Sequence, residues 1–155
     1  MPLVSRIEIV KKSKQPVISI KTKTKMENLP IVIGGETYGK IEEYLREIGE
    51  YPEDIPFVRY FNMDMENLKV EIGFPVYKEL PEKDDIEFSY IEEMKAVYGL
   101  YQGPYQEMGE TYDEIMIWIE DNGMKPTGIF LESYYNSPED VSEDKLLTRI
   151  LMPLD

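Results

Sequence analysis

The tetrapeptide Gly35-Glu36-Thr37-Tyr38 recurs 74 residues later as Gly109-Glu110-Thr111-Tyr112. The same offset joins further proline, apolar and glycine positions: Pro30 with Pro104, Ile41 with Ile115, Tyr44 with Trp118, Gly49 with Gly123, and Pro52 with Pro126. It also places Arg59-Tyr60-Phe61-Asn62 over Ser133-Tyr134-Tyr135-Asn136. One shared tetrapeptide can arise by chance, but matching positions in one order over this length predict an internal repeat.

Hydrophobic periodicity predicts the same order of elements, strand–helix–strand–strand, in two copies at about residues 5–78 and 86–155. In the first copy we expect strands at Arg6–Lys12, Val17–Lys25, Pro56–Asn62 and Leu68–Val76, with a helix inside Pro30–Gly49. In the second copy we expect strands at Glu92–Tyr101, Gly128–Asn136 and Leu146–Leu154, with a helix at Tyr105–Asn122. The closing strands match after four extra residues, so that Pro75 corresponds to Pro153.

This pattern predicts an α+β fold, in which residues 1–155 form a single domain of two modules related by a pseudo-twofold axis. Each module is too small to bury its antiparallel sheet alone. The second helix carries an apolar stripe, Met108, Tyr112, Ile115 and Ile119, with Trp118 on its flank. We expect each helix to cover one sheet face, so that the opposite faces of the two modules meet along a groove that suits a small molecule.

The composition excludes several classes of protein. The 155 residues include no cysteine and no histidine, which removes disulfides, thiol nucleophiles, Ser-His-Asp triads and haem or zinc sites with these ligands. The net charge of −14 argues against direct binding of nucleic acid. We see neither a secretory signal nor a membrane-spanning run, and we expect a cytoplasmic protein.

Cofactors and metals are not expected either. The acidic segments around Asp64 and Glu66 and in Pro138–Asp144 lack the spacing of a calcium loop. The Gly34-Gly35 pair lacks the pattern of a nucleotide-binding loop. Residues 1–25 carry seven basic side chains and one acid. They form either a strand face beside acidic helices, which we favour, or a basic interaction arm.

One strand of the second copy carries an acid in an apolar setting. Period-two alternation places Phe130, Glu132, Tyr134 and Asn136 on one face. The counterpart of Glu132 in the first copy is Val58, so the acid is specific to one half. It is either a structural residue, facing water or paired with a lysine, or a carboxylate in the groove that binds an organic cation between aromatic rings.

The chain also resembles a known family, the GyrI-like small-molecule-binding superfamily. The resemblance rests on Gly103-Pro104-Tyr105, Tyr112 with Trp118-Ile119 and Asn122-Gly123, Glu132-Ser133-Tyr134 with Pro138, and the ending Leu147-Thr148-Arg149-Ile150 to Pro153-Leu154. The superfamily includes effector-binding domains of multidrug-responsive transcription activators, a gyrase-inhibitory protein and hydrolases of cyclopropanoid genotoxins. The resemblance implies two fused strand–helix–strand–strand modules with a ligand channel, and Glu132 as the acid that contacts the ligand.

The expected ligand-lining residues are therefore Glu132, Tyr134, Phe130, Trp118, Tyr101 and Tyr60. The favoured function is a stand-alone module that senses or sequesters amphipathic, cationic or aromatic small molecules. The first alternative is a hydrolase of cyclopropanoid electrophiles, in which Glu132 positions or deprotonates water and Tyr134 donates a hydrogen bond to the carbonyl oxygen. The second alternative is a protein–protein inhibitor of the gyrase-inhibitor type, whose partner is unknown.

Overall fold

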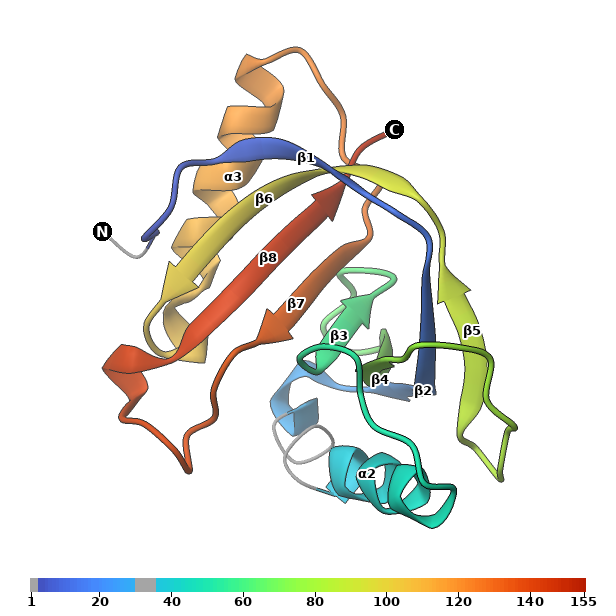
Figure 1. Cartoon of the computed structure of the whole chain (residues 1–155). Helices are drawn as coiled ribbons and strands as arrows, with labels where there is room; N and C mark the ends of the chain where they lie inside the picture. Colours follow the sequence, from blue (N-terminus) through green and yellow to red (C-terminus); the bar gives the residue numbers. More distant parts are fainter. Residues whose placement is uncertain (1–2, 30–35) are drawn as a thin grey trace. The chain divides into compact units, whose positions relative to one another are not determined.

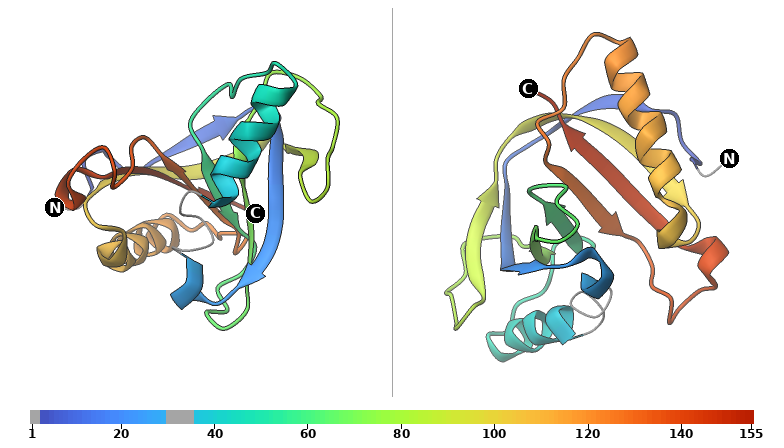
Figure 2. Two further views of the ribbon diagram at one scale, coloured as in Figure 1. Left: turned by 90° about the horizontal axis from the view of Figure 1, so that it is seen from below. Right: turned by 180° about the vertical axis from the view of Figure 1, so that it is seen from behind.

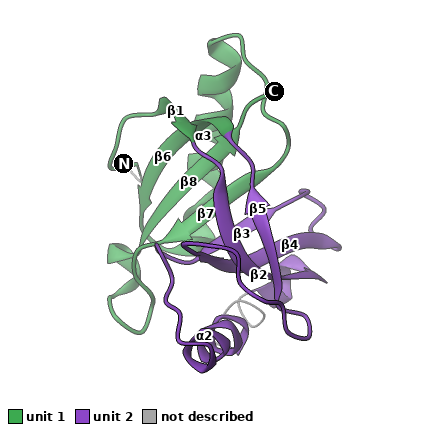
Figure 3. Ribbon diagram, turned by 45° about the vertical axis from the view of Figure 1, so that its right-hand side comes forward, with its two compact units in different colours: residues 1–12, 94–155 green, residues 13–93 purple. Residues whose placement is uncertain are grey.

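The computed structural model describes residues 3–29 and 36–155, and the chain is an α+β fold of antiparallel strands and helices, as predicted. It divides into two compact units (Figure 3). Unit 1 contains residues 1–12 and 94–155, and unit 2 contains residues 13–93. Pro30, Gly34 and Gly35, which belong to the patterns discussed above, lie outside the described residues.

Unit 2 has four antiparallel strands in the order β3-β4-β2-β5 (Figure 1). They are β2 (Gln15–Thr24), β3 (Phe57–Tyr60), β4 (Leu68–Pro75) and β5 (Glu87–Ile91). The register pairs Ile18 with Phe74 and Ile20 with Ile72. A short 3-10 helix, η1 (Met26–Asn28), follows β2, and the helix α2 (Tyr38–Glu47) precedes β3.

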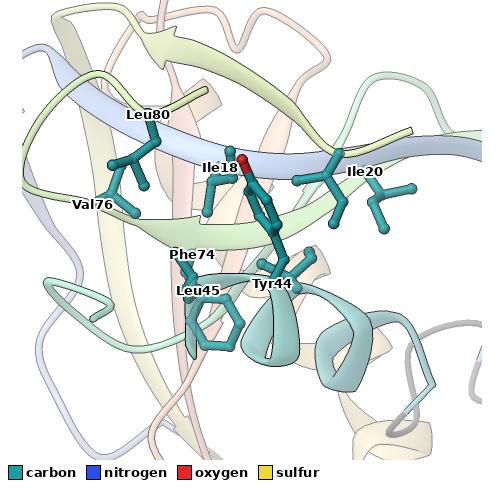
Figure 4. Packing of buried hydrophobic residues seen from close by; sticks show 9 residues of the cluster. Ile18, Ile20, Tyr44, Leu45, Phe74, Val76 and Leu80 are labelled. Carbon is teal, nitrogen blue, oxygen red and sulfur yellow. The ribbon is translucent and has the colours of Figure 1, made fainter. Parts of the chain in front are cut away.

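The core of unit 2 forms between α2 and one face of its strands (Figure 4). Ile41, Tyr44 and Leu45 are the buried side chains of the helix, and the strands contribute Ile18, Ile20 and Phe74. The two helix tyrosines also donate hydrogen bonds to backbone carbonyls, Tyr38 to Phe57 at 2.7 Å and Tyr44 to Pro81 at 2.5 Å. The core therefore combines apolar burial with fixed polar anchors.

Unit 1 has the strand order β1-β6-β8-β7, again with every pair antiparallel. The strands are β1 (Glu8–Lys12), β6 (Met94–Gln102), β7 (Phe130–Tyr134) and β8 (Leu147–Pro153). The 3-10 helices η3 (Tyr105–Glu107) and η4 (Glu143–Lys145) lie in the connections. The helix α3 (Gly109–Asp121) lies along one face of these strands (Figure 2).

The compact units do not coincide with the sequence repeats. The strand β1 comes from the first copy but pairs with β6 in unit 1, and β5 pairs with β2 in unit 2. We did not predict β5, because Glu87–Ile91 is a short segment that directly precedes the stronger strand pattern of β6. Strand pairing depends on long-range closure, which the local pattern does not contain.

The two long helices end in the same way. Gly49 follows α2 and Gly123 follows α3, both with φ of 71°. In each case the glycine amide and the amide after it donate to carbonyls in the last helical turn, which is a Schellman motif. This likeness supports the internal repeat, and superposition of Tyr38 on Tyr112 and Pro75 on Pro153 stays a prediction. Within the described residues, no helix has the length and apolar character needed to cross a membrane.

Unit 2 contains a buried ion pair on the sheet face away from α2. Arg59 Nη2 lies 2.6 Å from Glu71 Oε1, and Arg59 Nε donates to the same oxygen at 2.8 Å. Glu71 is fully buried, and Ser19 Oγ donates to its other oxygen at 2.6 Å. Alternation along β4 sets Glu71 opposite the apolar face, and nothing in the local pattern indicates that this second face is buried too.

Arg59→Met should lower the free energy of unfolding by about 3–5 kcal/mol, because Glu71 would keep its burial and lose its cation. The double variant Arg59→Met/Glu71→Leu should recover most of this loss, since it removes both charges together. Denaturant unfolding measures both effects.

The control is Lys40→Met, which breaks the exposed pair between Lys40 and Asp85. We expect that loss to stay below about 1 kcal/mol. Equal losses for Arg59→Met and Lys40→Met would contradict a structural role of the buried pair.

Candidate functional site

The strand β7 carries the candidate acid, Glu132, on a buried face. Glu132 pairs with Ile150 and Tyr134 pairs with Thr148 on the neighbouring strand β8. Glu132 is 8% exposed, and the alternation of the strand sets Phe130, also buried, on the same face. A carboxylate at such a position is costly unless polar groups surround it.

The helix α3 covers this same face. A Cβ built on Gly99 would lie 3.3 Å from Ile115 Cδ1 of the helix, and Gly99 and Glu132 both pair with Ile150. Cross-strand partners share a face, so Glu132 projects from the sheet face on which Ile115 of α3 packs. The groove was expected between the sheet faces opposite the helices, whereas Glu132 lies on the face that α3 covers. Alternation shows which residues share a face but not which element covers that face.

Two tyrosine hydroxyls hold the Glu132 carboxylate. Tyr112 Oη, from α3, donates to Glu132 Oε2 at 2.5 Å. Tyr134 Oη, from β7 itself, donates to Glu132 Oε1 at 2.6 Å. Hydrogen bonds from neutral hydroxyls to an ionised carboxylate are short and strong. These two bonds offset part of the desolvation of the acid and tie the helix to the strand.

Aromatic rings surround the carboxylate group. The rings of Tyr112 and Phe130 meet edge to face with centroids 5.1 Å apart. The rings of Tyr105 and Tyr134 meet in the same way at 5.7 Å. We call Glu132, Tyr112, Tyr134, Tyr105 and Phe130 the tyrosine–carboxylate cluster. All of its residues belong to unit 1.

Tyr105 senses the charge of this cluster. Burial raises the pKa of the Tyr105 hydroxyl above its ordinary value of 10.0, and the negative charge of Glu132 raises that pKa further. Tyr105 is nonetheless 37% exposed. The Tyr105 ring therefore lies at the boundary between solvent and the buried acid.

The other predicted site residues are distributed differently. Tyr101 shares the sheet face of Glu132, but it is 1% exposed and donates to the carbonyl of Pro104 at 2.5 Å, which gives it a structural role in the following turn. Trp118 is half-buried on α3. Because it follows Tyr112 by six residues, it lies about 120° around the helix from that side chain. Tyr60 is buried in unit 2, on β3.

Sequence reasoning missed Tyr112 and Tyr105 as members of the site. Tyr112 was assigned to the apolar stripe of the helix, and the buried neighbours Met108, Ile115 and Ile119 confirm that stripe. The available signal was its position in the repeated tetrapeptide, on a helix of the same sequence copy as the strand that carries Glu132. The sequence signal for Tyr105 was its position in the segment Gly103-Pro104-Tyr105.

The cluster combines a buried carboxylate with aromatic rings. A buried negative charge attracts a cation, and the faces of aromatic rings stabilise it further. The two hydroxyls keep the acid hydrogen-bonded when no cation is present. A cation that reaches Glu132 would take the place of one hydroxyl donor.

Comparisons with known proteins agree on one fold. The sequence model of the GyrI-like small molecule binding domain matches residues 5–155. No curated protein matches the chain. Among solved structures, the C-terminal domain of EcmrR has a TM-score of 0.85 at 20% identity, with 99% of each chain covered. In a complex of EcmrR with DNA, the TM-score is 0.83 at 21% identity, and the match covers 97% of this chain and 57% of that one.

Two further structures show the same fold. A hydrolase from Listeria innocua has a TM-score of 0.70 at 16% identity, covering 97% of this chain and 92% of the other. SAV2435 bound to tetraphenylphosphonium has a TM-score of 0.66 at 11% identity, covering 97% and 94%. The identities are low, so these structures establish the architecture and not a shared ligand.

We expect Glu132→Gln to lower the pKa of Tyr105 toward 10.0, because the substitution removes the negative charge that helps to raise it. NMR titration of tyrosine labelled at Cζ measures this pKa directly. In the parent protein the folded state favours the neutral phenol of Tyr105, and this preference raises its pKa. The contribution of the Tyr105 hydroxyl to the free energy of unfolding is therefore fully present below about pH 10, and it is lost as the pH rises through the pKa in the folded state.

Glu107→Gln is the control, because the charge of Glu107 raises the pKa of Tyr101 and is not among the causes that raise the pKa of Tyr105. It should leave the titration of Tyr105 in place. An unchanged Tyr105 titration in Glu132→Gln would show that Glu132 carries no charge in the folded protein.

Proposed function

Since the chain belongs to the GyrI-like family of small-molecule binding domains, we propose that it binds amphipathic organic cations with aromatic groups at the tyrosine–carboxylate cluster. Its role would be the sensing or sequestration of such compounds. The observation that carries the proposal is Glu132, a buried carboxylate whose two oxygens accept from Tyr112 and Tyr134. An acid maintained at this cost, among rings, suits a ligand that carries positive charge.

The ligand would engage the cluster through charge and ring contacts together. Its cationic centre would approach Glu132, and its apolar groups would contact the rings of Tyr105 and Phe130. Tyr112 and Tyr134, which donate to the acid, are half-buried. Displacing one hydroxyl costs a hydrogen bond, so a weakly charged or neutral ligand would gain too little to replace it. The cluster therefore supports selectivity for cations over neutral molecules of similar shape.

The structural neighbours are consistent with this proposal. SAV2435, which shares this fold, has been solved with tetraphenylphosphonium bound, a cation with four aromatic rings. Another neighbour is the C-terminal domain of a protein also seen bound to DNA. A role of this chain in regulation would require a partner whose interaction with the chain depends on whether the ligand is bound.

Glu132→Gln should weaken the binding of tetraphenylphosphonium by about 1–3 kcal/mol, the scale of a charge-assisted contact. Each 1.4 kcal/mol corresponds to about a tenfold change in Kd. Triphenylphosphine oxide, a neutral relative of the cation, should lose much less. Isothermal calorimetry on both variants with both compounds measures the four affinities.

The matched control is Tyr112→Phe, which keeps the ring and the acid and removes one hydroxyl donor. Because less of the carboxylate is then occupied, binding of the cation should be retained or strengthened. Equal losses for the cation and the neutral compound in Glu132→Gln would assign Glu132 a structural role and refute a charge-based site.

A hydrolase is the second candidate, favoured by the Listeria innocua neighbour and by the hydroxyl beside the acid. Glu132 would deprotonate water, and Tyr134 would donate to the carbonyl oxygen of a cyclopropanoid electrophile. Tyr134 already donates to Glu132, so that bond must open before it serves a substrate. The geometry therefore favours binding over turnover.

Incubation with a cyclopropanoid electrophile and, separately, with activated esters distinguishes these functions when both are followed by chromatography. Turnover of the cyclopropanoid alone, lost in Glu132→Gln, would establish the hydrolase. Cleavage of esters alone would refute the proposed chemistry. If neither compound reacts while tetraphenylphosphonium binds, the protein is a binder.

A further inference from the structure

The outer side of α3 carries exposed apolar side chains. The helix buries Thr111, Ile115 and Ile119, whereas Ile117 is 59% exposed and Met116 is 41% exposed. A surface hollow of about 470 Å³ lies beside them, with a lining that includes Met116, Ile117, Met124, Pro126, Asp113 and Glu120. We call this the α3 surface. Its lining includes no residue of the tyrosine–carboxylate cluster, so it is a separate feature.

The charge of α3 is one-sided. Gly109–Asp121 carries five acids and no base: Glu110, Asp113, Glu114, Glu120 and Asp121. Glu120 and Asp121 lie in the last turn, where the helix dipole disfavours negative charge. None of these five acids takes part in the ion pairs found among residues 3–29 and 36–155. A cation from outside would relieve this repulsion.

We propose that the α3 surface docks a basic amphipathic helix of a partner protein. Apolar side chains of that helix would enter the hollow, and its lysines or arginines would lie beside Asp113, Glu120 and Asp121. Methionines such as Met116 and Met124 adapt to different apolar partners because their side chains are unbranched. Charge complementarity would then select basic partners over acidic ones.

Charge and exposure argue against two other occupants. A second copy of this chain would bring another net charge of −14 to an acidic surface. A small organic cation would stay largely open to solvent there, whereas ligand pockets bury most of their ligand. Both remain outcomes of the test below.

The test uses the whole chain and a fluorescent 18-residue peptide with leucines on one helical face and lysines on the other. Fluorescence anisotropy at about 0.15 M salt should show saturable binding. A peptide with glutamate in place of lysine, and one with serine in place of leucine, should bind at least tenfold more weakly. Equal binding of the leucine and serine peptides would overturn the proposal, because attraction would then be purely electrostatic.

The variants locate the surface. Asp113→Lys/Glu120→Lys and, separately, Ile117→Ser should each weaken the leucine–lysine peptide at least tenfold. The matched control Glu92→Lys/Glu139→Lys changes the net charge equally at exposed positions that do not line the hollow, and it should change the affinity less than twofold. Equal losses in both charge-reversal variants would overturn the proposal.

Two further measurements separate the remaining outcomes. Circular dichroism and unchanged tetraphenylphosphonium binding would show that the variants keep their helix and the tyrosine–carboxylate cluster. Sedimentation of the unliganded chain should show no self-association through this surface. A dimer that dissociates in Ile117→Ser would assign the α3 surface to a second copy, and displacement of the peptide by tetraphenylphosphonium in Glu132→Gln would assign it to a small cation.

Discussion

The contact between Glu132 and the hydroxyls of Tyr112 and Tyr134 is the constraint on which the rest of unit 1 depends. A buried carboxylate needs donors, and Tyr112 of α3 supplies one of them. The requirement therefore sets how the helix lies against β7, and with it the positions of the rings of Tyr112 and Phe130. The apolar side chains Met108, Ile115 and Ile119 supply the burial, but they do not by themselves select one polar partner.

Unit 2 shows what the same sequence pattern does without an acid. Val58, the counterpart of Glu132, is fully buried, and Tyr38, the counterpart of Tyr112, donates to the backbone carbonyl of Phe57 instead. Both tyrosines still meet a phenylalanine edge to face, Tyr38 with Phe74 and Tyr112 with Phe130. One tyrosine position thus serves a closed apolar core in one unit and a polar centre in the other.

Unit 2 stabilises its buried acid, Glu71, in a different way. Glu71 forms an ion pair with Arg59 and accepts a hydrogen bond from the hydroxyl of Ser19. Its charge is therefore balanced within unit 2. Glu132 accepts hydrogen bonds from the neutral hydroxyls of Tyr112 and Tyr134. We therefore propose ligand binding for Glu132, which hydroxyl donors hold, and a structural role for Glu71, which a guanidinium holds.

The sequence by itself determined the α+β class, the two long helices with their glycine ends, most of the strands, and the shared face of Phe130, Glu132 and Tyr134. These features depend on local periodicity and turn chemistry, which the order of residues contains. Only the tertiary structure decided that α3 covers the face of Glu132 and that Tyr112 reaches its carboxylate. It also decided that β1 pairs with β6, that β5 pairs with β2, and that Arg59 neutralises Glu71. Each of these depends on which distant segment packs on a given face, and alternation along a strand is the same whichever segment arrives.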